Sequence, residues 1–207
     1  GLARPMTRLE SKLPNVGTTI FTVMSRLAAE CGAINLSQGF PDFDPPSQLV
    51  ERVTEHMRRG LNQYAPMAGW PALREQVAAK VREYYGATVD PEHEITVTSG
   101  GTEALFAAIQ AVVRPGDEVV VLDPCYDSYE PSVTLAGGRT IHVPLRRPDF
   151  AVDWYRVRDA CTPKRRLLIV NSPHNPSGAV FGAADLDALA DLLRGTDAFV
   201  LSDEVYE

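Results

Sequence analysis

Three short segments of the sequence combine glycine, amide, carboxylate and hydroxyl groups, and each follows a β-rich or apolar run. The first is Ser99-Gly100-Gly101-Thr102, which leads into a segment with helical periodicity. Glycines let a backbone approach a ligand closely, and the N–H groups at a helix N-terminus attract phosphate. The alternative is a plain N-cap in which Ser99 or Thr102 satisfies the first helical turn. No Gly-Lys-Ser/Thr follows, so the segment is not a P-loop.

The second segment, residues 171–178, contains two prolines and a glycine, which stiffen a loop. A stiff loop can hold the amide of Asn175 toward an oxygen atom of a planar ligand. The alternative, weighted equally from this loop alone, is a turn in which Asn171 and Asn175 cap their own backbone. We interpret His174 as a structural hydrogen-bonding residue rather than a catalytic one.

The third segment, residues 202–206, directly follows an apolar run that ends at Leu201, and its first carboxylate is Asp203. A carboxylate at the end of a buried strand needs a partner, because an unpaired buried charge is costly. A cationic ring nitrogen of a ligand would serve, and a hydrogen bond of this kind contributes about 1.5–3 kcal/mol. Tyr206 is close enough along the chain to direct its hydroxyl at the same ligand. The alternative is that Asp203 caps a helix that follows.

The elements that must position these segments alternate between strands and helices. Helical periodicity predicts helices over residues 21–31, 49–59, 71–85, 102–113 and 183–193. Short β-rich or apolar runs predict strands over residues 94–98, 118–122, 139–144, 166–171 and 198–202. Strands that are apolar on both faces predict a three-layer α/β/α fold with a mostly parallel sheet. Ligands bind such sheets beyond the carboxyl ends of the strands, where the three segments lie.

A loop over residues 37–47, rich in proline and glycine, marks the main boundary in the chain. We expect residues 1–44 to form an N-terminal arm and a segment of a small domain. Residues 45–207 are expected to form a large domain that is incomplete at its C-terminal end.

Composition excludes several classes of protein. The 207 residues are 44% hydrophobic and carry a net charge of −7, and the basic triplet at 164–166 suits a solvated loop better than a nucleic-acid site. The longest apolar runs are too short to cross a bilayer, and no secretory leader is visible. The three cysteines include no C-x-x-C pair, which predicts a reducing compartment, the cytoplasm.

Six motifs, in order, resemble the class I/II aminotransferases, which are fold-type I pyridoxal-phosphate enzymes. They are residues 35–41 (NLSQGFP), 63–66 (QYAP), 99–104 (SGGTEA), 123–126 (DPCY), 175–178 (NPSG) and 203–206 (DEVY). The similarity runs from about Leu13 to Glu207. Residues 36–43 and 171–176 are most similar to the methionine and kynurenine/glutamine aminotransferase branch.

The resemblance implies that one set of residues binds the cofactor pyridoxal phosphate. Gly101 and Thr102 would bind its phosphate, and Asp203 would pair with its protonated ring nitrogen. Asn175 and Tyr206 would hydrogen-bond the phenolic oxygen of its ring. The large domain, residues 45–207, would then be the cofactor-binding domain.

The resemblance also implies roles outside these loops. Tyr126 would stack on the pyridine ring, although its type also suits an ordinary core position. Tyr64 would reach the phosphate of a neighbouring subunit in a homodimer, and its alternative is surface or interface packing. Gly39 and Asn175 would seat the substrate carboxylate, while residues 17–21 resemble the family's arm near the pocket mouth.

The implied reaction is transfer of an amino group from an L-amino acid with a large neutral side chain to a 2-oxo acid, with ping-pong kinetics. It needs a lysine that holds the cofactor covalently. Of the three lysines, Lys12, Lys80 and Lys164, none follows a buried strand in the family's context. We therefore expect this lysine, and the arginine that binds the substrate carboxylate, beyond Glu207. No catalytic residue and no metal site are assigned within the chain, which is expected to be part of a longer protein.

Three other functions compete with this interpretation. Carbon–sulfur β-lyases and aminocyclopropane-carboxylate synthases resemble the same N-terminal half and use the same cofactor. A non-catalytic ligand-binding module, such as the aminotransferase-like half of a transcription regulator, would need a DNA-binding segment ahead of it. A generic nucleotide-binding domain would leave Tyr126, Asn175, Asp203 and Tyr206 without a role.

Overall fold

A computed structural model describes residues 10–39 and 41–207 and divides the chain into two units. Among the described residues, one unit comprises residues 10–17 and Ser99–Glu207, and the other lies within Thr18–Thr98. The first unit contains a parallel sheet with its covering helices, and the second contains helices joined by long loops. The predicted division between residues 44 and 45 concerns the complete protein and stays a prediction.

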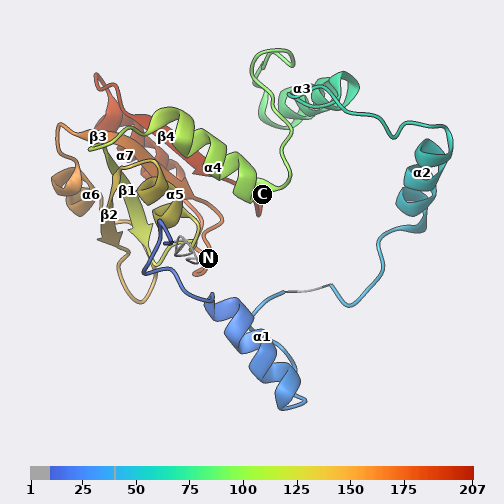
Figure 1. Ribbon diagram of the computed structural model, residues 1–207. Helices are drawn as coiled ribbons and strands as arrows, with labels where there is room; N and C mark the ends of the chain where they lie inside the picture. The colour runs from blue at the N-terminus through green and yellow to red at the C-terminus, as the bar shows by residue number, and fades with distance from the viewer. Residues whose placement is uncertain (1–9, 40) are drawn as a thin grey trace, which may run out of the picture. The chain divides into compact units, whose positions relative to one another are not determined.

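The first unit is built on a sheet of four parallel strands in the order β2-β1-β3-β4 (Figure 1). The strands are β1 (Glu118–Asp123), β2 (Arg139–Pro144), β3 (Arg165–Asn171) and β4 (Phe199–Asp203). Their ends lie within one residue of those predicted from the apolar runs. Because all strands are parallel, their carboxyl ends meet at one edge of the sheet.

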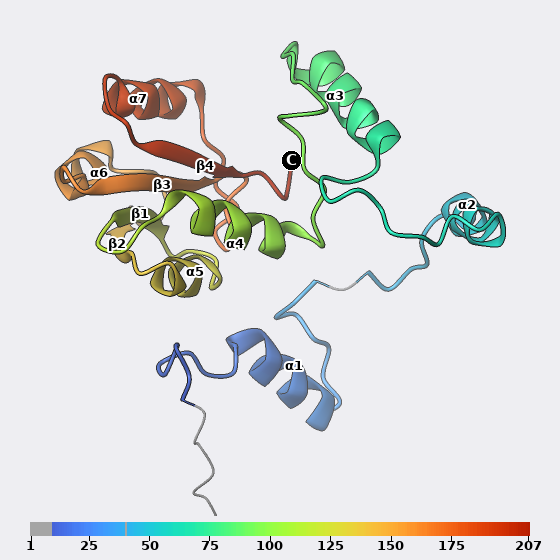
Figure 2. The same ribbon diagram turned by 45° about the horizontal axis from the view of Figure 1, so that its top comes forward.

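Helices cover both faces of this sheet (Figure 2). They are α4 (Gly101–Val112) and α5 (Tyr129–Leu135) on one face, and α6 (Trp154–Ala160) and α7 (Ala183–Leu193) on the other. Val119 and Val121 pack toward α4 and α5, whereas Val120 packs toward α6 and α7. This alternation places apolar side chains on both faces of β1, and the predicted three-layer α/β/α fold is confirmed.

The two shortest helices of this unit, α5 and α6, were not predicted. Each has seven residues, which is too few to show the helical period in the sequence. The helix α6 begins where Asp153 accepts hydrogen bonds from the backbone N–H groups of Tyr155 and Arg156, each at 3.2 Å. Its Val157 is fully buried against the sheet. Local capping and burial therefore form a helix that periodicity does not show.

The second unit contains α1 (Ile20–Glu30), α2 (Ser47–Arg58) and α3 (Pro71–Tyr85), all close to the predicted ranges. The Thr19 side chain caps α1, and Pro71 occupies the first turn of α3 as expected. Neither α1 nor α2 contains a buried residue. Across the described parts of the chain, no helix combines the length and apolar character that crossing a membrane requires.

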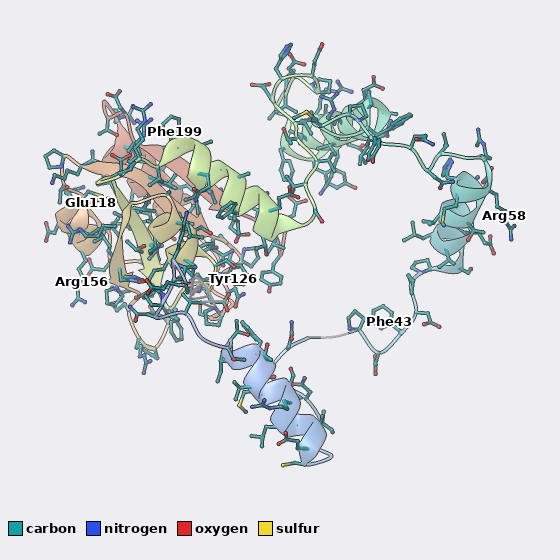
Figure 3. The ribbon with its side chains drawn as sticks, in the orientation of Figure 1. Phe43, Arg58, Glu118, Tyr126, Arg156 and Phe199 are labelled. Carbon is teal, nitrogen blue, oxygen red and sulfur yellow. The ribbon has the colours of Figure 1, made fainter. Side chains whose placement is uncertain are left out.

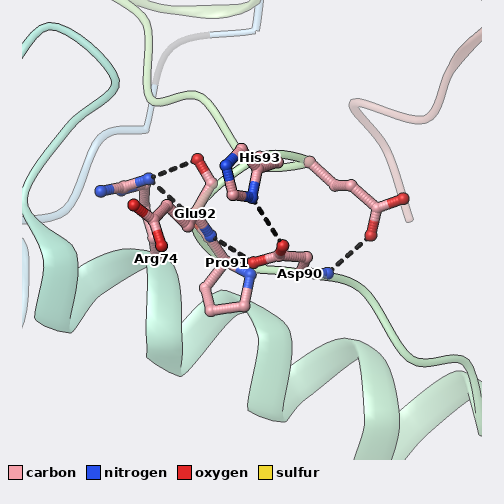
Figure 4. Close-up of polar contacts among 6 residues, drawn as sticks. Arg74, Asp90, Pro91, Glu92 and His93 are labelled. Carbon is pink, nitrogen blue, oxygen red and sulfur yellow. Dashed lines mark hydrogen bonds and ion pairs between the residues drawn. The ribbon is translucent and has the colours of Figure 1, made fainter.

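The strand predicted over residues 94–98 is wrong. Val97 donates its N–H to the carbonyl oxygen of Ala68 (3.0 Å), but residues 94–98 form no strand ladder with any other described segment. A side-chain network instead holds the preceding turn (Figure 4). In it, Arg74 Nη1 donates to the carbonyl oxygens of Pro91 (2.7 Å) and Glu92 (3.2 Å). A β-rich run needs a neighbouring strand to pair with, and none is present here.

Candidate functional site

A cavity of about 190 Å³ lies at the carboxyl edge of the sheet. It is lined by Gly101, Thr102, Leu105, Tyr126, Asn175, Asp203, Val205 and Tyr206. These residues come from four places: the start of α4, the loop after β1, the loop after β3 and the end of β4. Six of the residues that the sequence suggested for a cofactor site therefore border one cavity.

The glycine turn forms one end of this cavity. Gly100 is the N-cap of α4 with φ +84° and ψ 168°, a conformation that suits glycine. The Ser99 N–H donates to the Glu103 carboxylate, which closes the turn. A Cβ built on Gly101 would have no heavy atom within 4 Å, so the space beside the first turn of α4 is open. An anionic group placed there would meet the positive end of the helix.

Asp203, the last residue of β4, is held by both its side chain and its backbone. Its Oδ2 accepts a hydrogen bond of 2.6 Å from the Tyr129 hydroxyl, and its Oδ1 accepts one of 3.3 Å from the Val205 N–H. Its carbonyl oxygen accepts from Asn171 Nδ2 (2.8 Å) and from the Ser172 N–H (3.2 Å). The four residues after Asp203 form a turn, and its alternative role as the cap of a following helix stays open.

The two interpretations of the loop after β3 each apply to a different asparagine. Asn171 is buried, and its Oδ1 accepts a 2.6 Å hydrogen bond from the Asn175 N–H, as the turn interpretation expects. The Asn175 residue itself lines the cavity. His174 is buried with Nδ1 at 2.7 Å from Ser177 Oγ, and burial lowers its pKa. A neutral imidazole bonded within its own loop agrees with a structural role.

The aromatic wall of the cavity is Tyr126, which follows β1 (Figure 3). Its ring meets the ring of Tyr129 edge to face, with centroids 5.7 Å apart and an interplanar angle of 80°. The Tyr126 hydroxyl lies 3.3 Å from Thr102 Oγ1, which links the aromatic wall to the glycine turn. Tyr206, which follows β4, also lines the cavity, and about half of its surface is exposed.

Sequence reasoning missed Tyr129, which supports the site from the core. Its side chain is only 2% exposed, and burial together with the hydrogen bond to Asp203 raises its pKa. The two residues are 74 positions apart, so no local pattern reveals the contact. The one available signal is a second tyrosine only three residues after Tyr126, close to the end of the apolar run of β1.

A second cavity of about 620 Å³ shares Tyr126 with the first. Its lining includes Asp123, Cys125 and His142, whose potential ligand atoms lie within 4.8 Å of one another. Asp123 Oδ1 and His142 Nδ1 already form a 3.0 Å contact. Burial, reinforced by Asp123, raises the pKa of Cys125 to about 12, so the thiol keeps its proton. The trio is therefore a carboxylate–imidazole contact beside a thiol that keeps its proton, and we assign no metal to it.

Gly39 and Tyr64, the remaining residues suggested by the sequence, belong to the second unit. The Tyr64 side chain is fully exposed within that unit. Phe40, which belongs to the motif around Gly39, lies outside the described residues. The roles expected for Gly39 and Tyr64 therefore stay predictions.

The chemistry of the first cavity fits a flat, phosphorylated ring. One end offers a glycine turn and a helix N-terminus, which favour an anion, together with the Thr102 hydroxyl. Another segment offers the carboxylate of Asp203, an acceptor for a protonated ring nitrogen. Between them, Tyr126 offers an aromatic surface and Asn175 an amide. Pyridoxal phosphate has each of the complementary groups.

Comparison with known proteins agrees with this chemistry. The sequence profile of the family "Aminotransferase class I and II" matches residues 32–207. The methionine aminotransferase of Escherichia coli (strain K12) is 54% identical over 198 residues, covering 96% of this chain and 51% of that protein. The probable N-succinyldiaminopimelate aminotransferase DapC of Mycobacterium tuberculosis (strain CDC 1551 / Oshkosh) is 46% identical over 200 residues. This match covers 95% of this chain and 50% of that protein.

The solved structure of YbdL from Escherichia coli, reported to have a methionine aminotransferase function, matches with a TM-score of 0.94. It is 53% identical, and the match covers 97% of this chain and 53% of that one. The chain thus spans about half the length of the curated relatives that it matches. The resemblance to the methionine aminotransferase branch is confirmed. The chain belongs to the aminotransferase class I and II family.

Proposed function

We propose that the full-length protein is a pyridoxal-phosphate-dependent aminotransferase. It transfers the amino group of an L-amino acid with a large neutral side chain, methionine first among them, to a 2-oxo acid. The observation that carries this proposal is the single cavity shared by Gly101, Thr102, Tyr126, Asn175 and Asp203. Family membership and the methionine aminotransferase relatives support the choice of reaction and of substrate class.

Within this proposal, the chain's residues bind and orient the cofactor. Gly101 and Thr102 bind the phosphate at the N-terminus of α4. Asp203 holds a proton on the ring nitrogen, because an adjacent carboxylate favours the cationic form of that nitrogen. When bound, pyridoxal phosphate supplies an electron sink for the bond broken at the substrate Cα. Asn175 and Tyr206 hold the phenolic oxygen.

Other residues complete the site in the full-length protein. Tyr126 packs on the ring face, and Gly39 together with Asn175 seats the substrate carboxylate. We propose a homodimer in which Tyr64 of one subunit reaches the phosphate bound by the other. The lysine that binds the cofactor and the arginine that binds the substrate carboxylate are expected beyond Glu207. The three cysteines are free, which supports the proposed location in the reducing cytoplasm.

The test replaces the Asp203 carboxylate in the full-length protein. Asp203→Asn keeps the shape of the side chain but removes its charge, so we expect turnover with methionine to fall about a hundredfold or more. The amount of cofactor that the protein retains is expected to fall much less. Glu204→Gln is the matched control, because Glu204 is the adjacent carboxylate and does not line the cavity. Normal turnover in Asp203→Asn would rule out this assignment.

The products distinguish the proposed reaction from its alternatives. A transaminase converts methionine and a 2-oxo acid into a new pair of amino and oxo acids, with the parallel double-reciprocal lines of ping-pong kinetics. Release of ammonia and pyruvate from a sulfur amino acid would indicate a carbon–sulfur β-lyase. Turnover of N-succinyl-diaminopimelate in preference to methionine would favour the substrate of the relative from Mycobacterium tuberculosis.

A further inference from the structure

The hydroxyl of Tyr129 is a buried donor, and in the described part of the chain its hydrogen-bond partner is the carboxyl group of Asp203. The side chain is 2% exposed, and its oxygen lies 2.6 Å from Asp203 Oδ2. A carboxylate oxygen only accepts, so the tyrosine must donate. Burial and the hydrogen bond to Asp203 raise the pKa of Tyr129, so the hydroxyl keeps its proton across the physiological range. The contact is thus a hydrogen bond that the tyrosine hydroxyl donates to the side chain of Asp203.

The backbone of Asp203 is held independently of this bond. Asn171 Nδ2 and the Ser172 N–H both donate to the Asp203 carbonyl oxygen. The side chain, in contrast, can rotate about its own bonds unless its oxygens are engaged. Among the described residues, its other oxygen accepts only the 3.3 Å contact from the Val205 N–H. The Tyr129 hydroxyl therefore sets the direction of the carboxylate, while β3 and its loop set the position of the strand end.

Tyr129 is itself fixed by the helix that carries it and by the core. It is the first residue of α5 and belongs to the apolar cluster between α4, α5 and the sheet. Gln110 Nε2 of α4 donates to the carbonyl oxygen of Ser132 in α5 at 2.8 Å. The Tyr129 ring also supports Tyr126 edge to face. One buried ring thus braces two residues of the cavity that lie on different loops.

We infer that Tyr129 is a positioning residue, which aims the Asp203 carboxylate at the cofactor's ring nitrogen. This inference rests on the proposed function. Tyr129 does not line the cavity and so acts through Asp203. Removing its hydroxyl weakens the interaction with the ring nitrogen and leaves the phosphate and the ring face bound as before.

The experiment compares two ligands in the full-length protein freed of cofactor. One is pyridoxal phosphate, and the other is its carbocyclic analogue, in which a C–H replaces the ring nitrogen. In Tyr129→Phe, we expect the dissociation constant of pyridoxal phosphate to rise about tenfold, as loss of a hydrogen bond to a charged group predicts. The dissociation constant of the carbocyclic analogue should stay within about twofold of the wild-type value, because it lacks the atom that Asp203 contacts.

Tyr155→Phe is the matched control, because it removes the same hydroxyl from a side chain that is 78% exposed on α6. It should change neither dissociation constant. Tyr129→Met, which lacks the hydroxyl but keeps an apolar side chain, provides a second variant if Tyr129→Phe does not fold; loss of the ring beside Tyr126 should affect both ligands equally. The ratio of the two dissociation constants is compared in every variant.

A selective loss of affinity for pyridoxal phosphate supports the inference. Equal losses for the two ligands would show that Tyr129 only maintains the fold, and no loss would show that the hydroxyl is dispensable; either result overturns the inference. Failure of the wild-type protein to bind pyridoxal phosphate at all would instead overturn the proposed function. The two proposals can therefore fail separately.

Discussion

Gly100 has a backbone conformation that residues with a Cβ rarely adopt. Its φ of +84° and ψ of 168° lie in a region that is essentially restricted to glycine. Gly101, the next residue, has no positive φ and begins α4. A Cβ on either residue would meet no heavy atom within 4 Å, so backbone strain alone distinguishes the two sites.

We therefore predict that Gly100→Ala destabilises the full-length protein by about 1–3 kcal/mol, the cost of a sparsely populated backbone conformation. Gly101→Ala should change the free energy of unfolding by less than about 1 kcal/mol, because no strain opposes the methyl group. Urea denaturation of both variants measures the difference. Equal destabilisation by the two substitutions would contradict the strain assigned to Gly100.

Most residues of the cavity could be predicted from the sequence because each lies at a strand end or a helix start with a distinctive type. Asp203 and Asn175 are polar residues that follow apolar strands, and the paired glycines mark a turn. The support of Asp203 by Tyr129 could not be predicted. It depends on a contact across 74 positions, which only the packing of α5 against the sheet creates.

At the scale of elements, Glu118 joins three strands at the amino edge of the sheet, away from the cavity (Figure 3). Its carboxylate accepts hydrogen bonds from Thr162 Oγ1 and Arg139 Nη2, both at 2.6 Å. Thr162 precedes β3, and Arg139 begins β2. The hydrogen bond from Thr162, followed by that from Arg139, lowers the pKa of the buried Glu118.

This lowered pKa predicts a loss of stability in acid. The unfolded chain takes up its proton near the ordinary value of 4.5, whereas the folded protein resists protonation to a lower pH. The stabilisation is therefore complete above pH 4.5 and is lost as the pH falls through the folded pKa. Glu118→Gln should cost about 1–3 kcal/mol at neutral pH and flatten the pH dependence of the unfolding free energy below that value.

Chemical denaturation at several pH values measures this effect. Glu83→Gln, on an exposed face of α3, controls for the loss of one negative charge. An acid response in Glu118→Gln as steep as that of the wild-type protein would show that other carboxylates dominate. Thr162→Val should also lower the free energy of unfolding at neutral pH, but by less than Glu118→Gln. It removes the hydroxyl that donates to one Glu118 oxygen.

Helices could be predicted from the sequence where the helical period was long, and strands where both faces of the strand were buried. The continuous apolar run of β1 predicted a buried strand, and the period of α3 predicted a helix with both ends correct. The seven-residue helices α5 and α6 depend on caps and on burial of single residues such as Val157. Residues 94–98 have strand-like composition but no partner strand, and pairing is a tertiary property.

At the scale of the whole molecule, the proposed homodimer makes each site depend on two subunits. Asp203 belongs to the first unit and Tyr64 to the second, and the proposal assigns them to different subunits of one site. In a twofold-symmetric dimer, a contact made by one subunit is repeated by the other. A dimer with shared sites would therefore depend on both residues in each site, but in opposite subunits.

Hybrid dimers test this arrangement. We predict that full-length Tyr64→Ala and Asp203→Asn dimers each have little activity at limiting pyridoxal phosphate, because each lacks one group in both sites. In a hybrid of the two, isolated with two different affinity tags, one site carries both substitutions and the other carries neither. The hybrid should regain about half of the wild-type turnover, since one of two equivalent sites is intact. If Tyr64 served its own subunit, each site of the hybrid would carry one substitution, and activity would stay at the level of the parents.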